Sequence, residues 1–207
     1  DSQHLGGDQV AVRGDENGYQ KPLKHGRSAN HHAVELVQQI TAMNQGRYLA
    51  DDLLDAHPSD FCVGVAGYPE KPFEAPNPTT DLRHLKAKVD AGAEYVVTQM
   101  FFDNRRFFAF VDACRAAGIT VPIIPGLKVL TSRRHLTSIP RNFFVDIPSE
   151  LADEIAAAPD DEIAEIGALW TVRQTEELLA AGVPALHFFV MQSSHAIKKV
   201  MARLGSR

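Results

Sequence analysis

The chain contains 207 residues, of which 44% are apolar and 23% are charged, a composition typical of globular proteins. This length is enough for one large domain, or two small ones, with a real hydrophobic core. The net charge of −5 is spread without a long run of either sign, so nothing indicates binding to nucleic acid, and no apolar stretch approaches the roughly 20 residues that span a membrane.

The two cysteines, Cys62 and Cys114, lie in apolar surroundings and lack C-x-x-C spacing. We therefore expect both to be reduced residues of the core, where unpaired cysteines are usually found. This argues against a disulfide framework. Together with the lack of a recognisable secretory signal, it predicts a cytoplasmic protein.

Five short apolar runs predict β-strands. They are rich in Val, Ile and Phe and are too short for helices, which is typical of strands buried on both faces of a sheet. In chain order, the predicted strands cover 10–12, 61–67, 95–101, 121–126 and 185–190.

Between these runs, apolar residues recur with the period of an amphipathic helix. In the longest such segment, the expected apolar stripe includes Leu169 and Leu179. Gly92, Gly118 and Gly182 follow three of the segments and are well suited to end a helix. The predicted helices cover 32–43, 81–91, 105–117, 161–181 and 195–204.

Strands and helices therefore alternate along the chain, which predicts a parallel sheet with right-handed crossovers. Neither G-x-G-x-x-G nor G-x-x-x-x-G-K-[ST] occurs, so the phosphate loop expected of a doubly wound fold is missing. Polar or turn-forming residues instead follow every predicted strand: "RGDENG", "GYPEKP", "TQMFFDN", "PGLK" and "VMQSS". Chemistry spread over the carboxyl ends of successive strands is typical of a (β/α)8 TIM barrel.

Five strands are too few for such a barrel, which needs eight strands and typically about 250 residues. The first residues, "DSQHLGGD", resemble the end of a helix with its C-terminal glycines. We therefore expect that about three N-terminal β/α units are missing from this sequence, because five strands cannot close and would leave two bare edges.

Two polar residues at strand ends are candidates for a functional site. Asp15 follows the first predicted strand and is either a solvated turn carboxylate or a group of the active site. Tyr68 follows the small residues Ala66 and Gly67, which would let a flat ligand approach the backbone. Alternatively, Tyr68 caps the core at the end of its strand.

A third candidate, Gln99, lies inside an apolar run, where a buried amide needs hydrogen-bond partners. Thr98 and Gln99 point to opposite faces of the strand, so one of them faces the barrel interior. A Gln in that place favours a ligand-binding role. Asp81, Lys86 and Lys88 lie on the helix after Tyr68, where a solvated helix face is the simpler interpretation.

Other catalytic patterns are missing from the sequence. His187 has apolar neighbours on the last strand and is interpreted as a core histidine. The nine histidines show no H-E-x-x-H or H-x-H spacing, so no metal site is predicted. No G-x-S-x-G elbow and no cysteine nucleophile motif occurs. The residues alone therefore predict a barrel enzyme without defining its reaction.

Five stretches that occur in order with matching spacing together resemble the 5,10-methylenetetrahydrofolate reductase family: "VAVRGD", "CVGVAGYPE", "TDLRHLKAKVDAGAEYVVTQMFFD", "VPIIPGL" and "GVPALHFF". The likeness runs from about residue 5 to residue 204. It implies a (β/α)8 barrel that binds FAD, of which this sequence carries strands 4–8, as one catalytic domain over 1–207 that is incomplete at its N-terminus.

The resemblance also implies the reaction. NAD(P)H reduces FAD and leaves, and 5,10-methylenetetrahydrofolate then binds the same flavin face and receives a hydride to give 5-methyltetrahydrofolate. NADH and NADPH are both open as reductants. Further expectations from the likeness are a role in one-carbon metabolism and methionine biosynthesis and a homo-oligomer.

Site residues are carried over position by position. Arg13, Gly14 and Asp15 match an R-G-D that lies against the flavin, where a carboxylate would favour the cationic iminium form of the substrate. Gln99 matches the amide that hydrogen-bonds the pterin and, in the other half-reaction, the nicotinamide. The remaining matches to positions that contact FAD are Ala33, Ala66, Tyr68, Asp81 and Lys88, and Lys88 would suit the pyrophosphate.

This sequence also departs from the family pattern. Pro72 replaces a His that contacts FAD in many members, and Ser193 stands where many have an Arg that holds folate. His135 aligns with a Gln that some members use near the folate. The proton-donating Glu of the family lies on the first strand, outside this sequence. The departures motivate an alternative: a folate-binding relative with weak or no flavin binding and altered or lost reductase activity.

A third hypothesis comes from the tripeptide at 13–15, which also occurs in integrin ligands. An adhesion module would require an exposed loop and secretion, and neither a signal nor a disulfide framework supports it.

Overall fold

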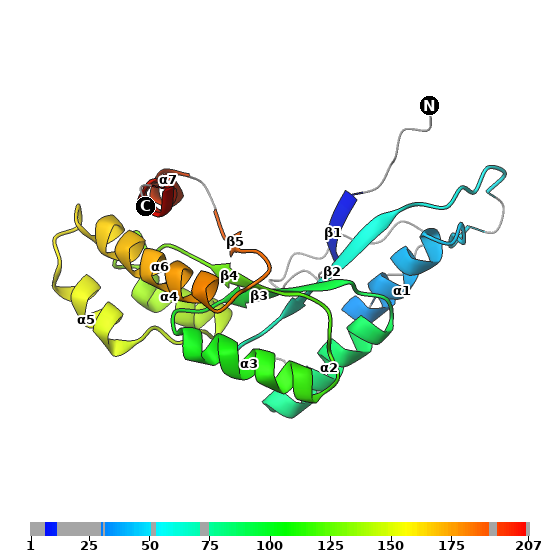
Figure 1. The fold of residues 1–207 in the computed structure, drawn as a ribbon, viewed down its shortest axis with the longest axis horizontal. Coiled ribbons are helices and arrows are strands. Elements are labelled where there is room, and N and C mark those ends of the chain that lie inside the picture. The colour runs from blue at the N-terminus through cyan, green and yellow to red at the C-terminus, as the bar shows by residue number, and fades with distance from the viewer. Residues whose placement is uncertain are drawn as a thin grey trace.

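A computed structural model of the chain contains one sheet of five parallel strands with helices between them (Figure 1). The structure describes residues 7–11, 30, 32–50, 53–70, 75–190 and 194–205.

Strand order in the sheet follows chain order, and every neighbouring pair is parallel. A doubly wound sheet would instead reverse direction at a switch point. Sequential parallel strands with helical crossovers form a curled sheet like part of a barrel wall. The strands are β1 (Gly7–Ala11), β2 (Phe61–Gly67), β3 (Tyr95–Met100), β4 (Ile123–Leu127) and β5 (His187–Phe188).

Several helices begin and end at residues that the sequence marks clearly. The Asn77 side chain caps the second helix by accepting from the Thr80 N–H at 2.8 Å, and Gly92 follows its end with a φ of 117°. The helices are α1 (Ala33–Met43), α2 (Pro78–Asp90), α3 (Asn104–Ala116), α4 (His135–Phe143), α5 (Ser149–Ala157), α6 (Ile163–Ala180) and α7 (His195–Gly205).

The main core lies between the sheet and the layer formed by α1, α2 and α3. Val65 and Val96 from the strands and Leu85 from α2 are almost fully buried there. Burial of each such side chain contributes about 1.5–3 kcal/mol. A second core joins the end of β3 to α4, α5 and α6, and includes Phe102 and Leu151.

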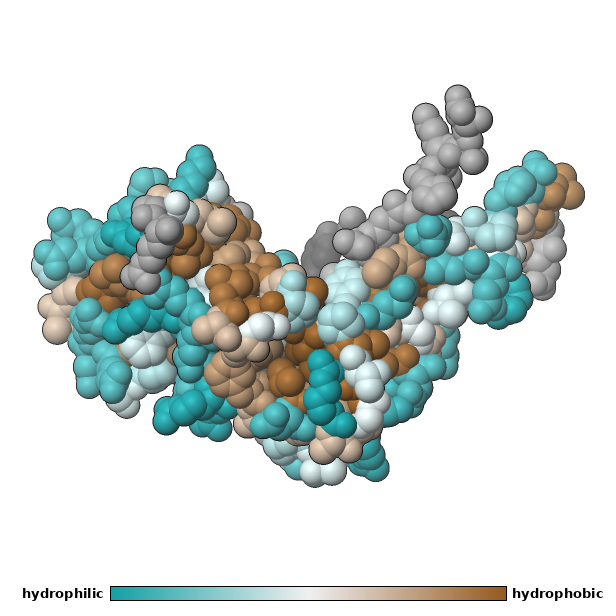
Figure 2. Space-filling model, in the orientation of Figure 1, coloured by the Kyte–Doolittle hydropathy of each residue, from teal (hydrophilic) through white to brown (hydrophobic). Residues whose placement is uncertain are grey.

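The middle of the visible face carries apolar surface where β4 and β5 lie, whereas the outer helices are largely hydrophilic (Figure 2). The β5 segment contributes Phe188 and Phe189, which are only half-buried, and Val190, which is exposed. The sheet is therefore less well covered on this face than on the face that packs against α1, α2 and α3.

The structure confirms the strand predicted at 61–67 and the general order of elements, but it corrects three details. Gly7 and Asp8 pair with Phe61 and Cys62, so they belong to a strand and not to the end of a helix. The last strand is only two residues long. In addition, α4 and α5 lie in a stretch for which the sequence predicts no helix.

The expectation that strands are buried on both faces is wrong for β3. Its burial alternates, with Val96, Thr98 and Met100 buried and Tyr95 and Gln99 only partly buried. Helices cover one face of the strand, and the described residues cover the other face incompletely.

The apolar stripe expected on the long helix is also partly wrong. Leu169 and Leu179 are 43% and 51% exposed, whereas Thr171 and Thr175 are buried. The threonine hydroxyls donate to backbone carbonyls one turn earlier, which satisfies them inside α6. Gly167 makes this packing close, because a Cβ at that position would overlap the Leu130 carbonyl oxygen.

Candidate functional site

The carboxyl ends of β2 and β3 bring two of the predicted site residues to the same edge of the sheet. Gly67 pairs with Thr98, so Tyr68 and Gln99 each follow directly after this pair on neighbouring strands. Both side chains are partly buried. Adjacent parallel strand ends place polar groups side by side, which is the arrangement that barrel enzymes use.

Gln99, and not Thr98, is the residue on the less covered face. Thr98 is 1% exposed, and its hydroxyl accepts from the Gly126 N–H at 2.9 Å. The Gln99 side-chain carbonyl accepts from the Met100 N–H at 2.9 Å, beside an irregularity in the pairing of β3 with β4. This local bond orients the amide and leaves its NH2 group as the donor end.

Lys88, Ala66 and Asp81 form a cluster behind the end of β2. The Lys88 Nζ donates to the Ala66 carbonyl oxygen at 2.6 Å. Asp81 and Lys88 are seven residues apart on α2, close to two helical turns, so they lie on the same side of the helix. Three residues that the sequence connects only through the family resemblance are therefore neighbours in space.

Burial shifts both charged groups of this cluster. Burial lowers the pKa of the Lys88 ammonium, and the nearby Asp81 opposes this effect. Burial also raises the pKa of the Asp81 carboxyl, while Lys88 opposes that shift. The two groups thus stabilise each other's charge in a partly buried place.

The donor set of the Lys88 cluster fits an anionic diphosphate. An ammonium has three N–H donors, and the Ala66 carbonyl uses one of them. Ala66 and Gly67 keep the adjacent backbone free of bulky side chains. A partly desolvated cation beside small residues at a strand end is suited to the pyrophosphate of a dinucleotide cofactor.

Several predicted residues are not brought to this cluster. Ala33 begins α1, and no described contact joins it to Lys88 or Ala66. His187 is exposed and lies 4.7 Å from the Phe189 ring centroid, so its interpretation as a core histidine is wrong. The remaining predictions concern Arg13, Gly14, Asp15, Pro72 and Ser193, which lie outside the described residues.

The sequence interpretation did not single out Lys128, which directly follows β4 at the same sheet edge. Burial lowers the pKa of its ammonium. His135, at the start of α4, has a lowered pKa because of burial and because Lys128 and Arg134 are close. Its Nδ1 accepts from the Thr131 N–H at 3.2 Å. The sequence could have indicated Lys128, because a cation that directly follows an apolar strand is expected at the functional edge of the sheet.

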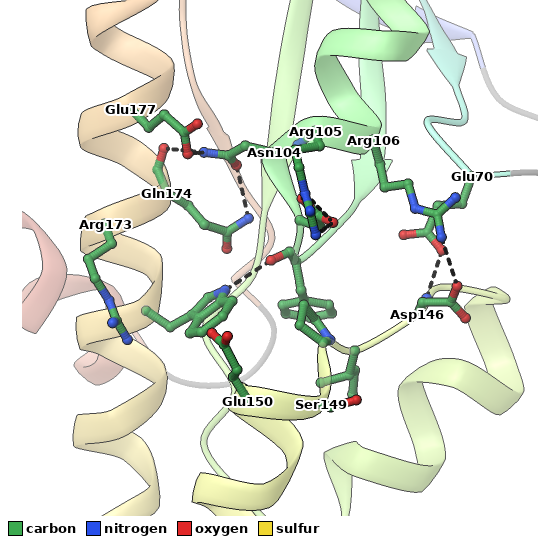
Figure 3. A pocket seen from close by; sticks show the side chains of 15 residues that line it. Glu70, Asn104, Arg105, Arg106, Asp146, Ser149, Glu150, Arg173, Gln174 and Glu177 are labelled. Carbon is green, nitrogen blue, oxygen red and sulfur yellow. Dashed lines mark hydrogen bonds and ion pairs between the residues drawn. The ribbon is translucent and has the colours of Figure 1, made fainter.

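A cavity of about 640 Å³ opens on the outer side of the same edge, between α3, α5 and α6 (Figure 3). Its wall includes Glu70 from the loop after β2 and Trp170 from α6. The Trp170 Nε1 donates to the Phe102 carbonyl at 3.0 Å, and the Glu70 carboxylate accepts from the Asp146 N–H at 2.8 Å. Of the predicted site residues that the structure describes, none lines this cavity.

Among the described residues, no group of three or more His, Cys, Asp or Glu side chains could hold a metal ion. Over the same part of the chain, no helix has the length and apolar character needed to cross a bilayer.

Comparison with known proteins identifies relatives along nearly the whole chain. Methylenetetrahydrofolate reductase 1 of Schizosaccharomyces pombe is 35% identical over 95% of this chain and 30% of its own length. The 5,10-methylenetetrahydrofolate reductase of Escherichia coli is 34% identical over 72% of this chain and 51% of its own length. The chain thus spans between about a third and a half of these relatives.

A solved structure also shows some likeness. It is an uncharacterized protein from Clostridium thermocellum that binds two copies of 5-methyl-5,6,7,8-tetrahydrofolic acid, with 18% identity and a TM-score of 0.48 over 69% of this chain and 52% of that one. The family profile of methylenetetrahydrofolate reductase matches residues 4–205, and the chain belongs to that family.

Proposed function

We propose that the protein reduces 5,10-methylenetetrahydrofolate to 5-methyltetrahydrofolate with NADH or NADPH as reductant and FAD as the bound redox cofactor. The observation that carries this proposal is the family match over residues 4–205, because it covers both strand ends that hold the Lys88 cluster and Gln99. Related reductases are named for NADPH in some organisms and for NADH in others, so their names leave the choice of reductant open.

The proposed fold is a complete (β/α)8 barrel in which the five described strands are strands 4–8. Sequential parallel order and the less covered face of β3 support this arrangement. Residues 1–207 would then belong to one flavin-binding catalytic domain, with further β/α units completing the ring. We place the protein in the cytoplasm, as a homo-oligomer that serves methionine biosynthesis.

The proposed cofactor contacts combine described and undescribed residues. Lys88 would hold the pyrophosphate, since its ammonium already lies at a strand end with donors to spare. Asp81 would keep that ammonium protonated. The other proposed contacts are Arg13, Gly14, Asp15, Ala33, Ala66 and Tyr68.

When bound, FAD supplies the two-electron chemistry that links NAD(P)H to the folate. The chain's own residues orient the substrates and stabilise charge. Gln99 would donate its amide NH2 to the pterin or the nicotinamide, because its carbonyl is already engaged by Met100. Asp15 would favour the cationic iminium form of the substrate, whose methylene carbon gains a hydride as the reductant is oxidised.

The test uses the purified full-length protein. We expect it to carry bound flavin and to oxidise NADH or NADPH when either menadione or methylenetetrahydrofolate is the acceptor. The Gln99→Leu variant should lose activity with both acceptors, since the amide would contact the nicotinamide in the first half-reaction and the pterin in the second. A wild-type protein that consumes no reduced nicotinamide with either acceptor would exclude the proposal.

The second candidate is a folate-binding relative with weak or no flavin binding. Pro72 and Ser193, which replace a flavin-contacting His and a folate-holding Arg of the family, favour it. Titration separates the two candidates: a relative of this kind would bind 5-methyltetrahydrofolate while FAD addition leaves its spectrum and flavin fluorescence unchanged.

A further inference from the structure

Residues 128–145, which follow β4 and include α4, concentrate positive charge at one part of the chain. They contain four Lys or Arg side chains and one His, but no Asp or Glu. The whole chain has a net charge of −5, so this stretch does not reflect the overall composition. It begins at the carboxyl edge of the sheet, where barrel enzymes bind their substrates.

Lys128 joins this stretch to the sheet. It directly follows β4, whose last residue, Leu127, is fully buried in the main core. Because side chains alternate along a strand, Lys128 is expected on the opposite, less covered face. Its side chain is only half-buried, so a ligand on that face can reach the ammonium.

The Lys128 ammonium loses water without gaining a counter-ion from the described residues. Burial lowers its pKa, and no carboxylate in the described part of the chain opposes this effect. A lysine can bury its aliphatic stem while its ammonium stays in water, but that arrangement would not lower the pKa. A partly desolvated cation gains most from an anionic ligand.

His135, at the start of α4, supplies a second donor beside Lys128. Its Nδ1 accepts from the Thr131 N–H at 3.2 Å, so the proton of the neutral ring is on Nε2. Burial, together with the positive charges of Lys128 and Arg134, lowers the pKa of His135 and keeps the ring neutral at pH 7. No described residue accepts a hydrogen bond from the Nε2–H, which is therefore available to a ligand.

Arg134 adds a second positive charge. Its neighbour Arg133 is engaged by Asp160 at 2.7 Å, whereas the exposed Arg134 has no ion-pair partner among the described residues. Lys128, Arg134 and His135 together therefore carry two positive charges and a neutral donor. A phosphate monoester, with a charge of about −1.5 to −2 at pH 7, matches this set better than a single carboxylate does.

The register of the sheet relates these donors to the proposed nicotinamide contact. Met100 pairs with Gly126, so Gln99 and Lys128 lie on neighbouring strands, which are about 5 Å apart. A dinucleotide is much longer than this spacing. Its adenosine ribose can therefore lie over the end of β4 while its nicotinamide contacts Gln99.

We propose that Lys128, Arg134 and the His135 Nε2–H bind the 2′-phosphate of NADPH, which makes NADPH the preferred reductant. This inference rests on the proposed function, because it concerns the nicotinamide half-reaction of that reductase. NADH lacks the phosphate and would leave both positive charges without a counter-ion. The glutamate carboxylates of folate are the competing anions, since His135 aligns with a residue that some family members use near the folate.

The kinetic test measures kcat and KM of the full-length protein for NADPH and for NADH, with menadione as acceptor. We expect kcat/KM for NADPH to exceed that for NADH by about tenfold or more. Lys128→Met should raise the KM for NADPH about tenfold or more, while kcat and both constants for NADH change by less than about twofold.

Two further variants locate the phosphate. Arg134→Met changes an exposed side chain and should raise the KM for NADPH without affecting NADH. Arg141→Met removes an exposed cation at the other end of α4 and should leave every constant unchanged.

Calorimetry with NADP+ and NAD+ measures the same discrimination without turnover. NADP+ should bind about tenfold or more tightly than NAD+, and Lys128→Met should remove most of the difference.

Three results would overturn the proposal: equal or better use of NADH by the wild-type protein, an unchanged preference for NADPH in Lys128→Met, or no tighter binding of NADP+ than of NAD+. A Lys128→Met protein in which only the KM for methylenetetrahydrofolate rises would overturn it in favour of the folate carboxylates. If neither reduced nicotinamide is oxidised, the proposed reductase function fails, and the calorimetry still decides whether the phosphate is bound.

Discussion

Lys88 shows how one side chain joins a helix to the candidate cofactor site. Its ammonium is held between the Ala66 carbonyl and the field of Asp81, and burial makes its charge unfavourable. A mutant without the charge escapes this desolvation but leaves the Ala66 carbonyl and the partly buried Asp81 without a partner, so it should be destabilised and should also bind an anionic ligand less well.

The first prediction follows from this balance. Lys88→Met should lower the free energy of unfolding by about 1–3 kcal/mol, because the Ala66 carbonyl and the partly buried Asp81 lose their partner, and should weaken FAD binding by at least about tenfold. Fluorescence titration with FAD and urea denaturation measure the two quantities. Lys86→Met is the matched control, since Lys86 pairs with Asp90 on the same helix and should leave FAD affinity unchanged. Equal FAD affinity in both variants would show that Lys88 does not contact FAD.

Asp81 leads to a prediction about pH. Burial raises the pKa of its carboxyl above the ordinary value of 3.8, so the folded protein holds this proton more tightly than the unfolded chain does. Between 3.8 and the raised pKa, the unfolded state therefore binds fewer protons, and the free energy of unfolding falls as the pH rises.

Asp81→Asn cannot titrate, so this part of the pH dependence should disappear in urea unfolding measured across a pH series. Asp112→Asn, which changes an exposed carboxylate on α3, should retain it. If the Asp81→Asn protein keeps the wild-type slope, Asp81 is not the group responsible.

For single residues, sequence patterns predict which side chains belong to the candidate site better than they predict what surrounds those side chains. Tyr68 is predicted from its place at a strand end and Gln99 from its place inside an apolar run, and the register of β2 with β3 shows that they lie at one edge. Pattern alone favoured a solvated face for Lys88, because the distance from Nζ to the Ala66 carbonyl depends on how α2 packs against β2. The pattern also predicts a buried His187, which is exposed, because the packing around it likewise depends on distant parts of the chain.

Among the elements, those with strong local signals were predictable. The run 61–67 became β2 without change, and α2 starts at an Asn-Pro cap and ends before Gly92. The helices α4 and α5 are short, and Pro140 lies inside the first of them, so their apolar residues do not form a long periodic stripe. Their position depends on tertiary packing against Phe102 and Leu130.

The close packing of α6 against Leu130 leads to a prediction about stability. A Cβ at Gly167 would overlap the Leu130 carbonyl, and neither backbone can move without disturbing the second core. Gly167→Ala should therefore lower the free energy of unfolding by at least about 2 kcal/mol, although Ala is the better helix former.

Urea denaturation measures the difference. Gly205→Ala is the control, because no atom lies within 4 Å of a Cβ placed there, and it should change stability by less than about 0.5 kcal/mol. A Gly167→Ala protein as stable as the wild type would show that α6 does not pack closely on Leu130.

Over the whole molecule, the order of five parallel strands is the feature that sequence patterns predicted most completely. Alternation of strand and helix was enough for that, because crossovers between parallel strands leave few topologies. Alternation could not predict the length of β5 or the cavity beside α6, since both depend on contacts between segments far apart in the chain. Strand-end chemistry and family membership together define the proposed reaction.

The most direct test of this account follows the visible absorbance of flavin in the purified full-length protein under anaerobic conditions. Addition of NADH or NADPH should remove the absorbance of the bound, oxidised cofactor, and subsequent addition of methylenetetrahydrofolate should restore it while 5-methyltetrahydrofolate forms in equal amount. A protein that binds no flavin, or whose absorbance does not return with the folate, would contradict the proposed function.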